Sequence, residues 1–175
     1  MSILDLLKSK KRQSPARPDG GETRTVREIV DALDRMPAER ARFAAAFAYL
    51  LGRVAYADLD ISRVESERME KLIEQVGGLD AEQALVVVQM AKTHAKLFGG
   101  TENYLVAREF DQIASGEQKR DLLRCLFAVA AADDQLSTAE DNEIRQIADE
   151  LKIDRREVAA LRAEHKDILA SLKQD

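Results

Sequence analysis

The chain has 175 residues, of which 45% are hydrophobic and 34% are charged, with eight glycines, three prolines and no tryptophan. This composition favours helices over a sheet, and the length is that of one ordinary domain with a full apolar core. The net charge of −5, with acidic and basic residues mixed along the chain, disfavours nucleic acid as a partner. The single cysteine excludes an internal disulfide and fits a reducing compartment.

Residues 1–24 are predicted to be a flexible tail and linker, because Pro15, Pro18 and Gly20-Gly21 interrupt helices. Residues 1–12 combine apolar and basic side chains, so they could also touch an anionic membrane surface, although so short a segment would bind weakly. The sequence contains no signal peptide and no apolar run of the ~20 residues that span a bilayer. We therefore expect a cytoplasmic protein, with contact at the inner face of the membrane as an option.

Residues 25–175 are predicted to form one all-α domain, a bundle of seven or eight helices. The first helix begins at the capping box Thr25-x-x-Glu28 and ends near Met36, and Pro37 opens the next. Apolar residues recur at spacings of three and four, and no pattern of period two persists. The later helices are expected over residues 38–58, 62–76, 80–98, 102–114, 122–133, 137–151 and 154–172.

Two stretches of the chain repeat each other at a constant offset of 128 − 53 = 75 residues. Residues 53–76 read RVAYADLDISRVESERMEKLIEQV, and residues 128–151 read AVAAADDQLSTAEDNEIRQIADEL. Both contain Ala-Asp-x-x-[Ile/Leu]-Ser-x-x-Glu between two helices. Such a duplication predicts a helical unit related to its copy by a pseudo-twofold axis, with like groups at like positions.

The Ser-x-x-Glu part of each copy is explained by helix capping. Ser62 with Glu65, and Ser137 with Glu140, are spaced to form capping boxes, each worth ~1 kcal/mol. Capping is therefore the first role expected of these four residues.

Capping does not explain the aspartate that precedes each serine by four residues. Asp58 and Asp133 end an apolar helix, where the helix dipole is already negative, so each carboxylate needs compensation. Three explanations are open. The carboxylate accepts hydrogen bonds within its own turn, it pairs with Arg53, Arg63 or Arg145, or it joins other oxygens around a divalent cation.

The cation explanation rests on the many hard carboxylates in these two acidic turns. Ca²⁺ and Mg²⁺ prefer such oxygens, whereas zinc would want His or Cys. The first turn is not an EF-hand loop, because Arg63 stands where that loop needs Gly and Met69 where it needs Glu. The candidate ligands are Asp58, Asp60, Glu65, Glu67, Asp133, Asp134, Glu140 and Glu143.

The doubled motif, the connecting segment EFDQIASGEQKRDLLRCLFAVAAAD and the closing RQIADELKIDRREVAALRAEH resemble the TerB family of tellurite-resistance proteins. The related domain of the DjlA co-chaperone is similar too. The resemblance covers roughly residues 27–165. It implies an internally duplicated helical bundle whose acidic turns form a proposed metal-binding surface. It also implies a bacterial cytoplasmic protein, partly membrane-associated through partners, in resistance to tellurite and other chemical stress.

The chain departs from the family pattern directly after each aspartate. Family members usually have Gly there, and this chain has Leu59 and Asp134. Glycine adopts positive φ freely, aspartate tolerates it, and leucine does so at a cost. Ligation by Asp133 is therefore expected to be more secure than ligation by Asp58.

Little else in the sequence suggests chemistry. His94 and His165 have no second His or Cys at ligand spacing, and Cys125 lies on an apolar helix, which favours a buried, inert thiol. Phosphate loops, nucleophile elbows and zinc-protease motifs are missing, so we do not expect an enzyme. The expected function is a TerB-like stress-response protein whose acidic turns bind Ca²⁺, Mg²⁺ or a protein partner. The alternative is a metal-free interaction module in which the turns are only helix caps.

Overall fold

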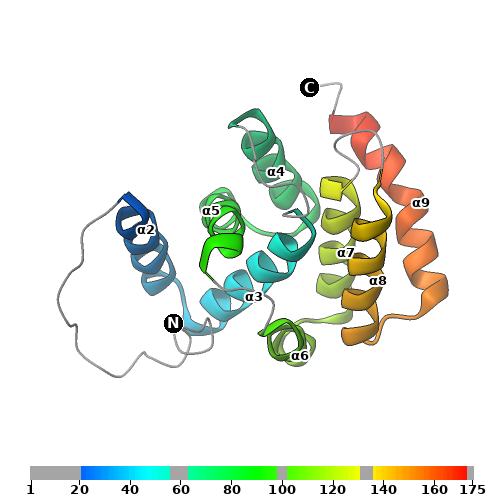
Figure 1. Ribbon diagram of the computed structural model, residues 1–175, viewed down its shortest axis with the longest axis horizontal. Helices are drawn as coiled ribbons and strands as arrows, with labels where there is room; N and C mark the ends of the chain where they lie inside the picture. The colour runs from blue at the N-terminus through cyan, green and yellow to red at the C-terminus, as the bar shows by residue number, and fades with distance from the viewer. Residues whose placement is uncertain (1–20, 56–62, 98–101, 131–135, 173–175) are drawn as a thin grey trace.

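The computed structural model describes residues 21–55, 63–97, 102–130 and 136–172. Eight α-helices and no strands lie in these ranges (Figure 1), which confirms the all-α prediction. The helices are α2 (Gly21–Arg35), α3 (Ala38–Ala55), α4 (Arg63–Val76), α5 (Ala81–Leu97), α6 (Asn103–Ile113), α7 (Gly116–Ala130), α8 (Thr138–Glu150) and α9 (Arg155–Leu172).

Helix α2 begins at Gly21, four residues before the predicted start at Thr25. The expected boundary between residues 24 and 25 therefore falls inside α2. The reason is local, because no proline lies between Pro18 and Pro37 to stop the helix from extending toward the N-terminus. Pro37 separates α2 from α3, as predicted.

The duplication seen in the sequence recurs in the helix bounds. Helix α3 ends at Ala55 and α7 ends at Ala130, while α4 begins at Arg63 and α8 begins at Thr138. Both pairs of positions are separated by the repeat offset, since 130 − 55 and 138 − 63 both equal 75. Helix pairs α3–α4 and α7–α8 are thus two copies of one unit.

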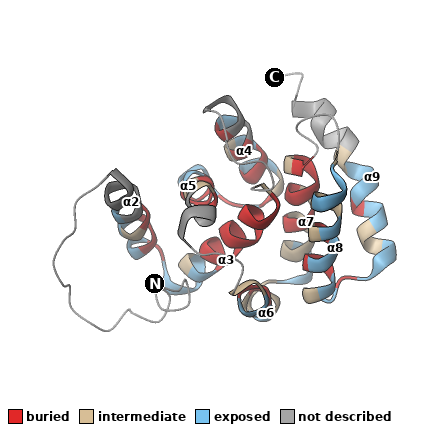
Figure 2. Cartoon of the chain, viewed as in Figure 1, coloured by how far each residue is buried: buried red, intermediate tan, exposed pale blue. Residues whose placement is uncertain are grey.

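Helix α3 is the centre of the bundle (Figure 1) and contacts α2, α5, α6, α7 and α8. Every residue from Phe43 to Val54 is buried (Figure 2). Alanines at positions 44–46 and 48 let the neighbouring helices approach closely on several sides. A helix surrounded in this way must be apolar around its whole circumference, and that makes its one charged buried residue, Arg53, conspicuous.

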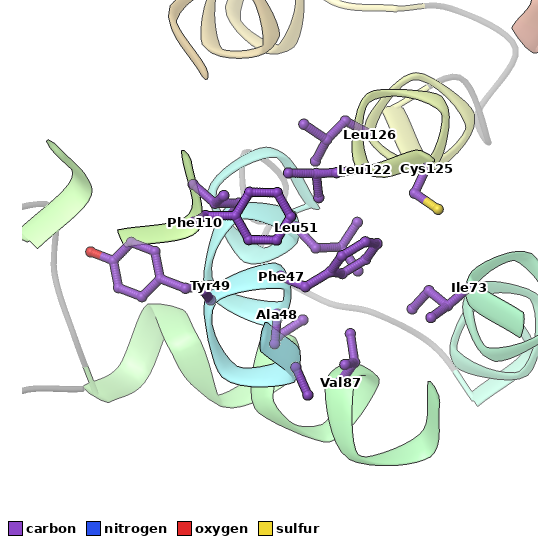
Figure 3. Close-up of a cluster of buried hydrophobic side chains, with 14 of the residues drawn as sticks. Phe47, Ala48, Tyr49, Leu51, Ile73, Val87, Phe110, Leu122, Cys125 and Leu126 are labelled. Atoms are coloured by element: carbon purple, nitrogen blue, oxygen red, sulfur yellow. The ribbon is translucent and has the colours of Figure 1, made fainter. Parts of the chain in front are cut away.

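The two sides of α3 differ in chemistry (Figure 3). On one side, Phe47 and Leu51 lie among apolar residues of α4, α5, α6 and α7, and the rings of Phe43, Phe47 and Phe110 have centroids 5.3–6.3 Å apart. On the other side, Tyr49 points away from this cluster with its hydroxyl outward. Apolar packing therefore surrounds α3, and on one side Tyr49 and Arg53 add polar contacts to it.

The outer helices bury only one face each. Exposed residues follow one side of α8 and of the described part of α9 (Figure 2), while Ile144, Ile147 and Leu161 face inward. Of the helices that the structure describes, none has both the length and the apolar character required to cross a membrane.

Candidate functional site

The candidate ligands of the two acidic turns are only partly within the described residues. Asp58, Asp60, Asp133 and Asp134 lie outside them, as does the side chain of Glu65. Of the other three candidates, Glu67 is exposed on α4, and Glu140 and Glu143 are half-buried on α8. Both α3 and α7, the helices that lead into the turns, end toward the top of the view in Figure 1.

The second copy forms the predicted capping box at the start of α8. The backbone N–H of Glu140 donates to Ser137 Oγ at 3.2 Å, and the backbone N–H of Ser137 donates to Glu140 Oε2 at 2.8 Å. Two otherwise orphaned N–H groups are satisfied in this way. Glu140 therefore already has one carboxylate oxygen engaged in a structural role.

Glu143 forms a part-buried ion pair that links the two copies. Arg53 donates from Nε to Glu143 Oε1 and from Nη1 to Glu150 Oε2, both at 2.7 Å. The Arg53 side chain is only 2% exposed, so water screens these bonds little. Helix α3, which leads into the first acidic turn, is thereby fixed to α8, which follows the second.

Two of the arginines considered as partners for Asp58 and Asp133 make other pairs. Arg53 pairs with α8 as described, and Arg145 pairs with Asp141 at 2.8 Å on its own helix. Asp141 also meets Arg162 of α9 at 3.3 Å. The pairs found for these arginines therefore stabilise the packing of α8.

A polar cluster surrounds Arg53 on the side of α3 that faces away from the aromatic rings. We define it as Tyr49, Arg53, Glu102, Asn103, Glu143 and Glu150. Tyr49 donates its hydroxyl proton to Asn103 Oδ1 at 3.0 Å. Burial raises the pKa of the Tyr49 phenol, and the negative charges of Glu102 and Glu150 raise it further, whereas the charge of Arg53 lowers it.

This polar cluster contains two unsatisfied atoms. Arg53 Nη2 and Glu102 Oε2 are buried without a hydrogen-bond partner, and they are the only such side-chain atoms among the residues that the structure describes. From the sequence, Arg53 was predicted only as a partner for aspartate, and Glu102 and Glu150 were not among the predicted functional residues. The available signal was one arginine within an otherwise apolar helix, which requires buried acceptors on whatever packs against it.

No group of three or more His, Cys, Asp or Glu side chains in the described ranges is arranged to hold a metal ion. Glu140 and Glu143 each have one oxygen committed, to a helix cap and to Arg53. Because each carboxylate keeps a second oxygen, both remain compatible with ligation. A cation site would nevertheless depend on the aspartates of the turns for most of its oxygens.

Cys125 and His165, which the sequence offered as further candidates, pack against the apolar interior. Cys125 is fully buried, and burial raises the pKa of its thiol, as expected for an inert cysteine. His165 is half-buried against Phe127, with ring centroids 6.3 Å apart. A cavity of about 600 Å³, partly lined by Arg40 and Phe43, lies at the start of α3, at the opposite end from Ala55.

The duplicated motif and the paired helices that contain it occur in a known protein family. The family model described as tellurite resistance protein TerB matches residues 44–163, more than half of the chain. The chain belongs to the TerB family. The match to TerB includes both acidic turns and leaves α2 outside. A search of curated proteins and a search of solved structures gave no match.

Proposed function

We propose that this TerB-family protein acts in a bacterial response to tellurite or other chemical stress by binding at its two acidic turns. The bound species would be a divalent cation, Ca²⁺ or Mg²⁺, or a basic surface of a partner protein. One observation carries the proposal: Arg53 of α3 bonds to Glu143 of α8. This contact joins the helix that precedes the first acidic turn to the helix that follows the second, and so supports a joint function of the two turns.

The chemistry of the turns supports the same proposal. Asp58 and Asp133 follow the negative ends of α3 and α7, where a carboxylate is unfavourable unless a positive charge or hydrogen-bond donors compensate it. Asp60 and Asp134 add further hard oxygens, and Glu65, Glu67, Glu140 and Glu143 complete the candidate set. In this proposal the protein is not an enzyme. It works in the cytoplasm and reaches the membrane through partners or through residues 1–12.

A cation titration followed by amide NMR tests this function. We expect millimolar Ca²⁺ or Mg²⁺ to shift the amides of residues 58–67 and 133–143 in the natural chain. The shifts should be lost in the double variant Asp58→Asn/Asp133→Asn, because two ligands lose their charge. A matched control is Asp31→Asn/Asp34→Asn, which removes two exposed carboxylates from α2. If the natural chain shows no shifts in either turn, the cation part of the proposal is wrong.

The alternative is a metal-free interaction module, and the commitments of Glu140 and Glu143 favour it. In this module the turns only cap helices, and the partner binds another helix face or residues 1–12. A pull-down from native lysate distinguishes the two functions. Recovery of the same partners by Asp58→Ala/Asp133→Ala, together with indifference to cations, would support the metal-free module.

A further inference from the structure

Helix α2 is attached to the margin of the bundle. It lies at one edge of the molecule, and its main neighbours are α5 and α3 (Figure 1). Its inward stripe is spaced at three and four residues and consists of Ile29, Ala32, Leu33 and Met36. These side chains are 6–9% exposed, whereas residues 44–51 of α3 are 0–1% exposed. The contact of α2 with the bundle is therefore apolar but less completely closed to water than the centre of the core.

An ion pair shows which face of α5 receives α2. Arg35 of α2 meets Glu82 of α5 at 3.9 Å. Val86 and Met90 follow Glu82 by one and two turns on the same face, and both are buried. Val87, on the next face, points toward α3 (Figure 3). We call Glu82, Val86 and Met90 the α2 seat, an apolar strip with one acidic residue at its end.

Apolar burial is the main attraction between α2 and its seat. The side chains of Arg35 and Glu82 are 68% and 70% exposed, so water and salt screen their ion pair. The TerB match begins at residue 44, so it includes the seat and leaves out the helix that covers it. An amphipathic helix with the same apolar spacing would satisfy the seat equally well.

The joint between α2 and α3 is short and consists of Met36 and Pro37. The N–H of Met36 donates back to Leu33 O at 3.1 Å, and Pro37 O accepts from the N–H of Ala41 at 2.9 Å. Because proline has no N–H, residue 37 donates no hydrogen bond back to α2. Helix α2 can therefore change direction here while both helices keep these bonds. So short a joint also leaves a helix little room to fold back on its own chain, which favours exchange between chains.

We propose that the α2 seat is an interaction surface for α2 of a second copy, so that two chains exchange this helix and form a dimer. A second copy fits by construction, since its α2 carries the same apolar stripe and the same Arg35. A chain that releases α2 exposes apolar residues on both α2 and α5, and reciprocal exchange buries both sets again. This dimer depends neither on the acidic turns nor on a ligand.

Exchange is tested with a mixture of two forms of the full chain. One form carries a nitroxide at Asp31→Cys on the exposed face of α2, and the other is isotope-labelled for amide NMR; the fully buried Cys125 stays unlabelled. After incubation at high protein concentration, we expect amides near residues 82–90 of the isotope-labelled chain to lose intensity, because α2 of the nitroxide chain lies against them. A nitroxide at the exposed Asn142→Cys on α8 is the matched control and should leave these amides unchanged. Undiminished intensities with the α2 label would overturn the proposal.

Two variants distinguish exchange from contact between intact surfaces. Insertion of Gly-Ser-Gly-Ser between Met36 and Pro37 gives α2 room to fold back onto its own α5, so the dimer fraction measured by light scattering should fall severalfold. Leu33→Asp places a charge in the apolar stripe and should also remove the dimer, whereas Asp31→Asn on the exposed face of α2 should retain it. A dimer that persists in both the insertion variant and Leu33→Asp, or a natural chain that stays monomeric at every concentration, would show that α2 is not exchanged.

Discussion

In the described part of the chain, one non-glycine residue has a positive φ. It is Lys152, whose φ is 59°. It follows α8, where its N–H donates to Asp149 O and the N–H of Ile153 donates to Ala148 O. A residue in this left-handed position closes the helix end, and glycine fills it without the steric cost of a Cβ. The residue here is lysine, and its side chain forms an ion pair with Asp111.

Lys152→Gly should therefore raise the free energy of unfolding by a few tenths to about 1 kcal/mol. The relief of about 1–2 kcal/mol in the backbone exceeds the 0–1 kcal/mol of an exposed ion pair, and the Lys152 side chain is 77% exposed. Urea denaturation at pH 7 measures the difference. Lys152→Ala is the control, because it loses the same ion pair and keeps the strain. A glycine variant less stable than the alanine variant would contradict this explanation.

Gly77 is required by close packing at the end of α4. A Cβ at this position would lie 2.7 Å from Ile73 O and 3.2 Å from Phe47 Cζ. Gly77→Ala should lower the free energy of unfolding by about 1–3 kcal/mol, because backbone and a core ring would have to move. Thermal and urea unfolding measure the effect.

Gly78→Ala is the matched control for that substitution. Gly78 has a φ of 67° and no heavy atom within 4 Å of an added Cβ, so only the backbone opposes alanine there. That cost is about 1 kcal/mol. Equal effects of the two substitutions would mean that contact with Ile73 and Phe47 does not limit the size of residue 77.

At the scale of elements, capping boxes begin three helices in the described ranges, and the box predicted at Ser62 lies outside them. Ser137-x-x-Glu140 at α8 was predicted, whereas Asp80-x-x-Gln83 at α5 and Ser115-x-x-Gln118 at α7 were not. The same spacing is visible in the sequence at both missed positions, with Gln in place of Glu. Glutamine supplies the same acceptor oxygen, so the pattern could have been recognised from the sequence.

Ser137→Ala should destabilise the protein by about 1 kcal/mol, since a cap of the Glu140 N–H is lost. Ser115→Ala should have an effect of similar size at α7, because the distances in the two boxes match within 0.1 Å. Denaturant unfolding of both variants provides the comparison. An effect at Ser137 several times larger than that at Ser115 would show that Ser137 has a role beyond capping.

At the scale of the whole molecule, Asp111 ties three parts of the bundle together. From α6 it accepts hydrogen bonds from Lys119 of α7 and from Lys152 after α8, and these bonds lower the pKa of its carboxyl. A carboxyl with a lowered folded pKa adds stability above its unfolded pKa of about 3.9. That stability is lost as the pH falls through the lower, folded pKa.

Asp111→Asn should therefore be less stable than the natural chain at pH 7, and the difference should shrink as the pH falls below about 4. Urea denaturation at a series of pH values measures this dependence. Asp34→Asn on the exposed face of α2 is the control and should show little difference at any pH. A difference between Asp111→Asn and the natural chain that stays constant from pH 7 to pH 3 would show that the charge of Asp111 is not the cause.

The sequence by itself determined the all-α class, the duplication, most helix bounds within a few residues and the cap at Ser137, because these depend on interactions between residues close in the chain. The apolar character of residues 38–58 also predicted a helix packed closely on several sides. Only the tertiary structure decided which helices surround α3 and that Glu143 is held by Arg53. Arg53 is 90 positions from Glu143 and 97 positions from Glu150 in the sequence. Their pairing depends on which helix faces meet, and helical periodicity carries no information about which charge on one helix faces which charge on another.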